Sequence, residues 1–119
     1  CHGGPRHAGT KVYSFSEIGT DDALAKWNDG DGDGKPDHPL LGPGDSLTGG
    51  VKSPRLTGAW TLKRFLHNGS VDSLEALFCV DSKRPTNTKP VFSDKGHMYT
   101  CDGLSATEKS QLIAYLKSI

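Results

Sequence analysis

The sequence is poor in apolar side chains and contains no long hydrophobic run. Hydrophobic residues make up 34% of the chain, against about 45–50% in ordinary globular domains, a benchmark that also counts glycine. No apolar stretch approaches the ~18 residues of a membrane-spanning helix, so we expect no membrane span. A chain of 119 residues is expected to form one small domain. Its core needs support from a disulfide, a metal, a large cofactor or a partner domain.

The sequence also lacks a net charge and has few cysteines. Lys and Arg together number 14, as do Asp and Glu, and this balance argues against a nucleic-acid-binding surface. The cysteines number three, which is odd. One allocation assigns Cys1 to a covalent cofactor and pairs Cys79 with Cys101. Such a disulfide would indicate an oxidising compartment, either the periplasm or the cell exterior.

The chain begins with Cys1-His2, followed by two glycines. This pattern matches the second half of a C-x-x-C-H haem-attachment motif, whose first cysteine would precede Cys1. In this interpretation Cys1 forms a thioether to haem c and His2 is the proximal ligand of the haem iron. The alternative is an ordinary N-terminal segment with a free thiol.

A run of alternating aspartates indicates a calcium site. The pattern is D-x-D-x-D-G-x-x-D, formed by Asp29, Asp31, Asp33 and Asp37. Alternating carboxylates can surround one hard cation, and the glycine after the third aspartate permits the sharp turn. The twelfth position of an EF-hand loop carries a bidentate glutamate, but here it is Leu40. We therefore expect a truncated loop that binds calcium through the four carboxylates and the backbone carbonyl of Lys35. A solvated acidic turn is the alternative.

Removing calcium is expected to lower the melting temperature of the protein. An ion that binds only the folded state stabilises that state by mass action. A chelator therefore removes the stabilisation that the ion provides. Thermal unfolding followed by circular dichroism, with excess calcium and with chelator, measures the effect. Identical melting curves under the two conditions would exclude the site.

Local signals predict three helices, at about 21–27, 72–78 and 105–118. Each begins at a capping residue, namely Thr20, Asp72 and Ser105. The second and third also carry the glutamate of a capping box, Glu75 and Glu108. The last helix should bury an apolar stripe of Leu112, Tyr115, Leu116 and Ile119. Residues 1–19 are expected to form a loop with a short extended piece.

The block at residues 54–78, PRLTGAWTLKRFLHNGSVDSLEALF, resembles the C-terminal haem domain of the dihaem cytochrome c peroxidase superfamily. It is closest to the dihaem oxidoreductase-like or thiol-oxidoreductase-like branch, which is similar to the rubber oxygenases. Three further segments support the resemblance in the order of the family: residues 1–5, 18–21 and 96–109. The sequence departs from the family pattern in two ways: it lacks the first haem cysteine and the second haem domain. Both would be explained by a C-terminal fragment of a larger dihaem protein.

The resemblance implies a mainly α, cytochrome-c-like domain over residues 1–119, with short helices and long loops around one haem. It implies an electron-transfer role, since peroxidase or oxygenase chemistry would belong to the other haem, so the domain would not be catalytic alone. Its partners would be the second haem domain of the same protein and an electron donor or acceptor protein. A calcium-stabilised extracellular binding or structural module without haem is the competing hypothesis.

Three residues could supply the distal iron ligand, namely His97, Met98 and His67, and an open site is a further alternative. The resemblance falls on Gly96-His97 and favours His97, with Met98 as the alternative. His67 lies in a turn motif and is expected to donate or accept a hydrogen bond near the haem edge. The apolar residues Trp60, Leu62, Phe65 and Leu66 are expected to wall the haem and lower the local dielectric.

Overall fold

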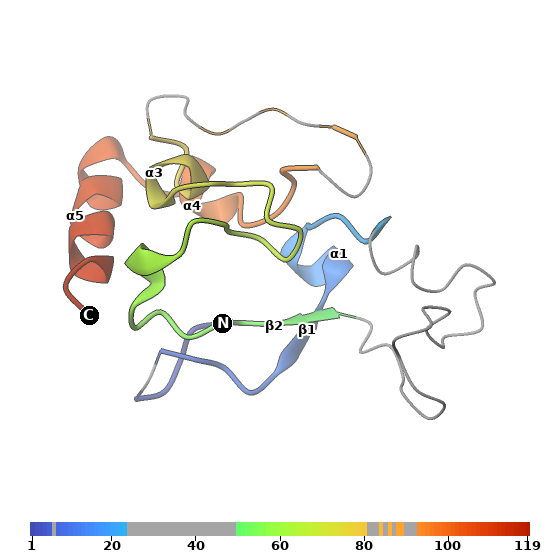
Figure 1. Cartoon of the computed structure of the whole chain (residues 1–119), viewed down its shortest axis with the longest axis horizontal. Coiled ribbons are helices and arrows are strands. Elements are labelled where there is room, and N and C mark those ends of the chain that lie inside the picture. The colour runs from blue at the N-terminus through green and yellow to red at the C-terminus, as the bar shows by residue number, and fades with distance from the viewer. Residues whose placement is uncertain (6, 24–49, 81–83, 85, 87, 90–92) are drawn as a thin grey trace.

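The computed structural model describes residues 1–5, 7–23, 50–80, 84, 86, 88–89 and 93–119. Its elements are β1 (Val12–Ser14), α1 (Phe15–Ile18), β2 (Gly50–Lys52), the 3-10 helix η1 (Ala59–Thr61), α3 (Leu74–Leu77), α4 (Tyr99–Asp102) and α5 (Ala106–Leu116). Figure 1 places α5 at one side with α3 and α4 near its upper end, and the β1–β2 ribbon lower in the view. The segment that follows β2 runs between these two regions.

The expectation of a mainly α fold is wrong for the described residues. Helices account for only about a third of them, and β1 and β2 form a two-stranded antiparallel sheet. Val12 pairs with Lys52 and Ser14 with Gly50. A Cβ atom at Gly50 would lie 2.1 Å from the carbonyl oxygen of Tyr13, so the glycine permits this close approach. Strand pairing depends on such distant partners, which local propensity does not reveal.

The last predicted helix is confirmed. Helix α5 begins after Ser105, whose hydroxyl accepts from the backbone N–H of Glu108, and the Glu108 carboxylate accepts from the Ser105 backbone N–H. This reciprocal pair satisfies two donors that a helix start leaves unpaired. The predicted buried stripe needs one correction, because Tyr115 is 45% exposed while Ile113 is buried.

The second predicted helix is shorter than expected. Helix α3 covers Leu74–Leu77, and its cap is Ser73, not Asp72. Ser73 has an extended backbone and its hydroxyl accepts from the N–H of Ala76, while the Asp72 carboxylate accepts from that same hydroxyl. Serine and aspartate cap almost equally well, so two adjacent candidates leave the start undecided by one residue. The helix predicted at 21–27 lies mostly outside the described residues, and α1 and α4 were not predicted.

One hydrophobic core holds these short elements together. It comprises Phe65, Val71, Leu74, Ala76, Leu77, Phe78, Ile113 and Leu116. These residues come from α3, from α5 and from a β-bridge between Phe65 and Val71. The core therefore joins the middle of the chain to its C-terminal helix, leaving the N-terminal residues to be held by other contacts.

Candidate functional site

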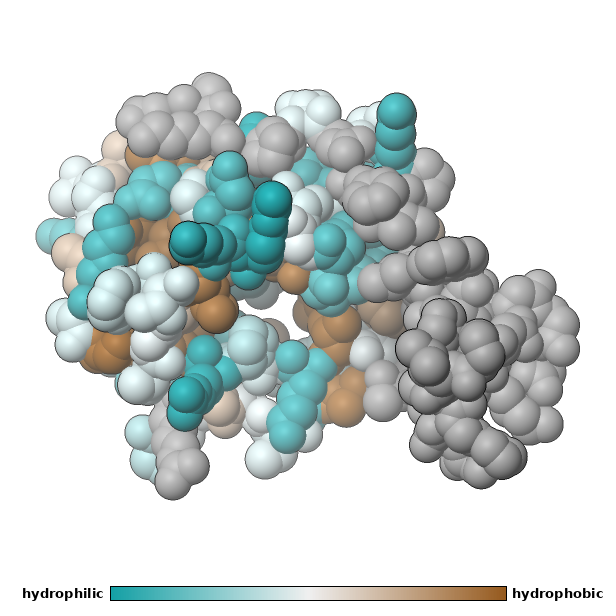
Figure 2. Space-filling view, in the orientation of Figure 1, coloured by the Kyte–Doolittle hydropathy of each residue, from teal (hydrophilic) through white to brown (hydrophobic). Residues whose placement is uncertain are grey.

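A large apolar cavity opens beside this core. Its volume is about 570 Å³, within the range of about 300–1,000 Å³ typical of ligand sites. Figure 2 shows an opening in the middle of the face, bordered by hydrophobic and strongly hydrophilic residues. The walls come from the N-terminus, β2, the segment 53–67, α3, the loop before α4 and α5. Segments from along the whole described chain thus enclose one space.

The N-terminus is fixed against the segment that follows β2. The carbonyl oxygen of Cys1 accepts a hydrogen bond of 2.7 Å from the hydroxyl of Ser53. The ring of His2 donates from Nδ1 to the carbonyl oxygen of Pro54, at 2.8 Å. A carbonyl oxygen can only accept, so Nδ1 carries a proton, and in the neutral ring it is Nε2 that keeps the lone pair. His2 is thereby oriented with a nitrogen available to a metal, as ligating histidines are.

His97 is held on the loop just before α4. Its backbone is left-handed, with φ of 58°, and the hydroxyl of Thr100 donates to its carbonyl oxygen at 2.9 Å. Because that hydroxyl proton is used, the Thr100 oxygen accepts from His97 Nδ1 at 3.2 Å. Nε2 of His97 therefore also keeps its lone pair.

The protonation of His97 favours metal binding as well. Burial lowers the pKa of His97 to about 4, and the nearby His2 and the positive charge of Arg84 act in the same direction. The imidazole is then neutral near pH 7, which is the form that coordinates a metal. A buried neutral histidine is also stable without a ligand, so the residues that face His97 distinguish the two cases.

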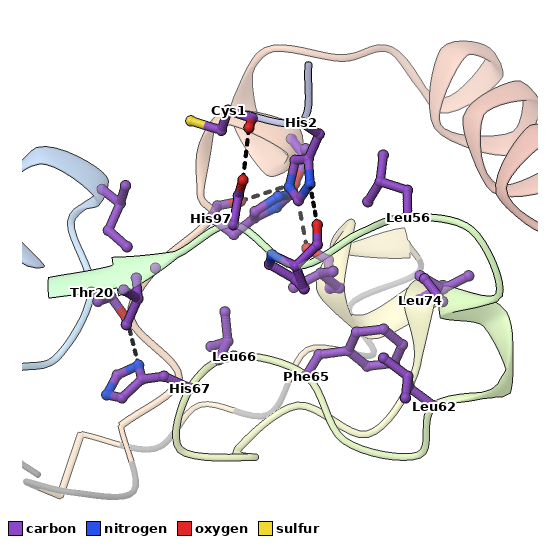
Figure 3. A pocket seen from close by; sticks show the side chains of 18 of the residues that line it. Cys1, His2, Thr20, Leu56, Leu62, Phe65, Leu66, His67, Leu74 and His97 are labelled. Atoms are coloured by element: carbon purple, nitrogen blue, oxygen red, sulfur yellow. Dashed lines mark hydrogen bonds between the residues drawn. The ribbon is translucent and has the colours of Figure 1, made fainter. Parts of the chain in front are cut away.

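His2 faces His97 although the two residues lie near opposite ends of the chain. Their ring centroids are 6.5 Å apart, with 63° between the ring planes, and Figure 3 shows both rings at the same side of the cavity. The thiol of Cys1 is free and Cys1 is exposed at the cavity lining. The structure brings together three residues that the sequence singled out: a thiol and two imidazoles.

Of three other residues predicted to contact the cofactor, one lines the cavity and two lie outside its lining. Phe65 is buried and lines the cavity. Trp60 is 53% exposed and is not part of the lining, so it does not form the expected wall. Met98 is 41% exposed and is also outside the lining. In η1, the neighbouring Ala59 is the buried residue, which leaves Trp60 facing outward.

His67 lines the cavity at a distance from the histidine pair. In Figure 3 its ring lies beside Thr20, and Leu66 separates it from the centre of the view. Nδ1 of His67 is 3.4 Å from the hydroxyl of Thr20, which donates to the carbonyl oxygen of Lys95. Nε2 is buried, and no described residue forms a hydrogen bond with it. Burial lowers the pKa of His67, opposed by the charge of Asp21.

Arg84 positions the loop that carries His97, and sequence analysis missed it. Its side chain is 6% exposed and forms an ion pair with Asp94 at 3.3 Å. The guanidinium also donates to the carbonyl oxygens of Asp94 and Gly96, the latter at 2.6 Å, and to that of Leu77 at 3.3 Å. One buried cation thus joins the end of α3 to the residues just before His97. The polar stretch around Arg84 gave no signal of burial.

The predicted disulfide is confirmed. Cys79 and Cys101 are bonded, with their Cα atoms 5.1 Å apart. Cys79 follows α3 and Cys101 lies in α4, so the bond ties the core to the helix that follows His97. Together with Arg84, it fixes the His97 loop from both sides.

The predicted calcium ligands lie outside the described residues. Asp29, Asp31, Asp33, Lys35 and Asp37 all belong to this group. Within the described ranges, no three His, Cys, Asp or Glu side chains are grouped to hold a metal ion. Two histidines alone would hold a metal only if other ligands, such as the nitrogens of a porphyrin, completed its coordination.

Comparison with family models, curated proteins and solved structures finds no match to this chain. No helix in the part of the chain that the structure describes combines the length and apolarity needed to cross a membrane. The chemistry of the cavity is therefore the basis for a functional proposal.

Proposed function

We propose that this chain is the electron-transfer c-type haem domain of a dihaem oxidoreductase or peroxidase-like protein. His2 is the proximal ligand, His97 is the distal ligand and Cys1 forms a thioether to the haem. The observation that carries the proposal is the approach of the His2 and His97 rings beside an apolar cavity, at a centroid distance of 6.5 Å.

The ring distance fits one metal ion shared by two imidazoles. A metal–nitrogen bond is about 2 Å, and the ring centre lies about 1 Å beyond the nitrogen, so two opposed ligands have centroids about 6 Å apart. Each ring is held by a hydrogen bond at Nδ1, which leaves both Nε2 atoms as the donors. The apolar lining suits the body of a porphyrin, and the free thiol of Cys1 suits its covalent attachment.

The chemistry that haem supplies when bound is the reversible change between ferric and ferrous iron. The residues of this chain determine what use is made of it. His2 and His97 would both hold the iron through their imidazoles, which would favour electron transfer over binding of peroxide or oxygen. The apolar side chains Phe65, Leu66 and Leu74 line the cavity, and their contact with a bound haem would limit its exposure to water and so influence its reduction potential.

The disulfide supports a periplasmic or extracellular location, because such bonds persist in oxidising compartments. Electrons would enter or leave through a donor or acceptor protein and through a second haem domain of the same protein. Both partners follow from the family resemblance.

Covalent haem in the purified protein tests the proposal. We expect a Soret band, and haem that stays with the polypeptide after denaturation and acidic organic extraction, because a thioether survives both. The variant Cys1→Ser should release its haem in the extraction, whereas His7→Ala, a histidine outside the cavity lining, should not. A colourless protein would reject the proposal and favour the calcium-stabilised module without haem.

A further inference from the structure

The charged residues that line the cavity all carry the same sign. They are Lys52, Arg55 and Arg64, and no aspartate or glutamate belongs to the described lining. The rest of the lining is mainly apolar apart from the histidines and a few hydroxyl groups. A chain with equal numbers of acidic and basic residues has therefore placed only cations at this site.

The side chains of these three cations form no ion pair with any residue in the described part of the chain. Three acidic groups of the described part pair with other cations: Glu17 with Lys11, Glu75 with Lys117 and Asp94 with Arg84. Lys52, Arg55 and Arg64 are all exposed, which places their charges at the mouth of the cavity, not at its base. Figure 2 likewise shows strongly hydrophilic residues beside the opening.

Each cation lies on a segment of backbone that has a defined contact, and one of these contacts also holds His2. Lys52 is paired with Val12 in the β-ribbon. Arg55 directly follows Pro54, whose carbonyl oxygen holds His2. The aliphatic part of the Arg64 side chain packs against the turn at Gly69. A Cβ atom built on Gly69 would lie 3.6 Å from the Cβ of Arg64. The cations are thus arranged on ordered segments at the rim.

We infer that the mouth of this cavity binds the carboxylate groups of a ligand whose body is apolar, through Lys52, Arg55 and Arg64. Arginine recognises carboxylates by two parallel hydrogen bonds, and the apolar walls receive the remainder of the ligand. The inference rests on the proposed function for the identity of the ligand: in haem these groups are the two propionates. It assigns the solvent-facing edge of the cofactor to this rim.

Iron-free protoporphyrin IX tests this subsite separately from iron ligation, because it has two carboxylates and no metal for His2 or His97 to bind. The full chain, checked for folding by circular dichroism, is titrated with the porphyrin and with its dimethyl ester in the same dilute detergent buffer. Fluorescence reports binding. We expect the dicarboxylate to bind more tightly than the ester, and only its affinity to fall as salt is raised.

The double variant Arg55→Gln/Arg64→Gln should weaken binding of the dicarboxylate roughly fivefold to tenfold, as expected for two exposed ion pairs, and leave the ester unaffected. The control Lys63→Gln/Lys95→Gln removes the same charge from residues outside the lining and should change neither affinity. Equal affinities of acid and ester, or equal losses in the two double variants, would overturn the inference. Haem ligation is assessed independently, since His2→Ala and His97→Ala should abolish the low-spin spectrum with iron porphyrin.

Discussion

Replacing His97 with alanine is expected to convert the proposed haem from low spin to high spin and to let carbon monoxide bind the ferrous form. The side chain of His97 faces His2 with 6.5 Å between ring centroids, and it is neutral near pH 7 because burial lowers its pKa to about 4. Removing it would leave His2 as the one remaining histidine ligand of the proposed haem iron. Absorption spectra of the ferric protein, and of the ferrous protein under carbon monoxide, measure the change.

Two further variants make this result specific. His97→Gly suits the left-handed backbone at this position, where φ is 58°, and added imidazole should restore its low-spin spectrum. Met98→Leu should change little, because Met98 is 41% exposed and lies outside the cavity lining. If Met98→Leu alone loses the low-spin spectrum, the distal ligand is Met98 and our assignment is off by one residue.

Replacing Arg84 with methionine is expected to destabilise the protein by about 3–5 kcal/mol, the usual cost of breaking a buried ion pair. The change removes the guanidinium that donates to the carboxylate of Asp94 and to the carbonyl oxygens of Asp94, Gly96 and Leu77. A loss of this size should lower the melting temperature by more than about 10 °C. Thermal and urea unfolding measure it.

An exposed ion pair supplies the matched control for Arg84. The side chains of Lys117 and Glu75 are 53% and 31% exposed at a distance of 2.8 Å, so Lys117→Met should cost about 1 kcal/mol or less. A positioning role for Arg84 also predicts a spectroscopic effect. Arg84→Lys keeps the positive charge but loses the planar set of N–H donors of the guanidinium. This variant should give a mixture of low-spin and high-spin haem. An unchanged spectrum together with equal stability losses in Arg84→Met and Lys117→Met would contradict the role assigned here.

Local signals were sufficient where a feature depends on neighbouring residues. The capping box of Ser105 and Glu108 involves groups three residues apart, and it fixed the start of α5 before any tertiary contact was known. The disulfide is not local, since Cys79 and Cys101 are 22 residues apart, but assigning Cys1 to the haem left only these two cysteines to pair. The identity of His2 and His97 as candidate ligands also came from short motifs.

Tertiary structure decided the features that depend on distant partners. The pairing of β1 with β2, the outward position of Trp60 and the burial of Arg84 could not be read from local pattern. The sequence by itself singled out His2 and His97 as candidate ligands of the proposed haem. Only the folded chain decided that His2 and His97 meet, because the hydrogen bond to Pro54 and the Arg84 network each act across a separate segment of the backbone.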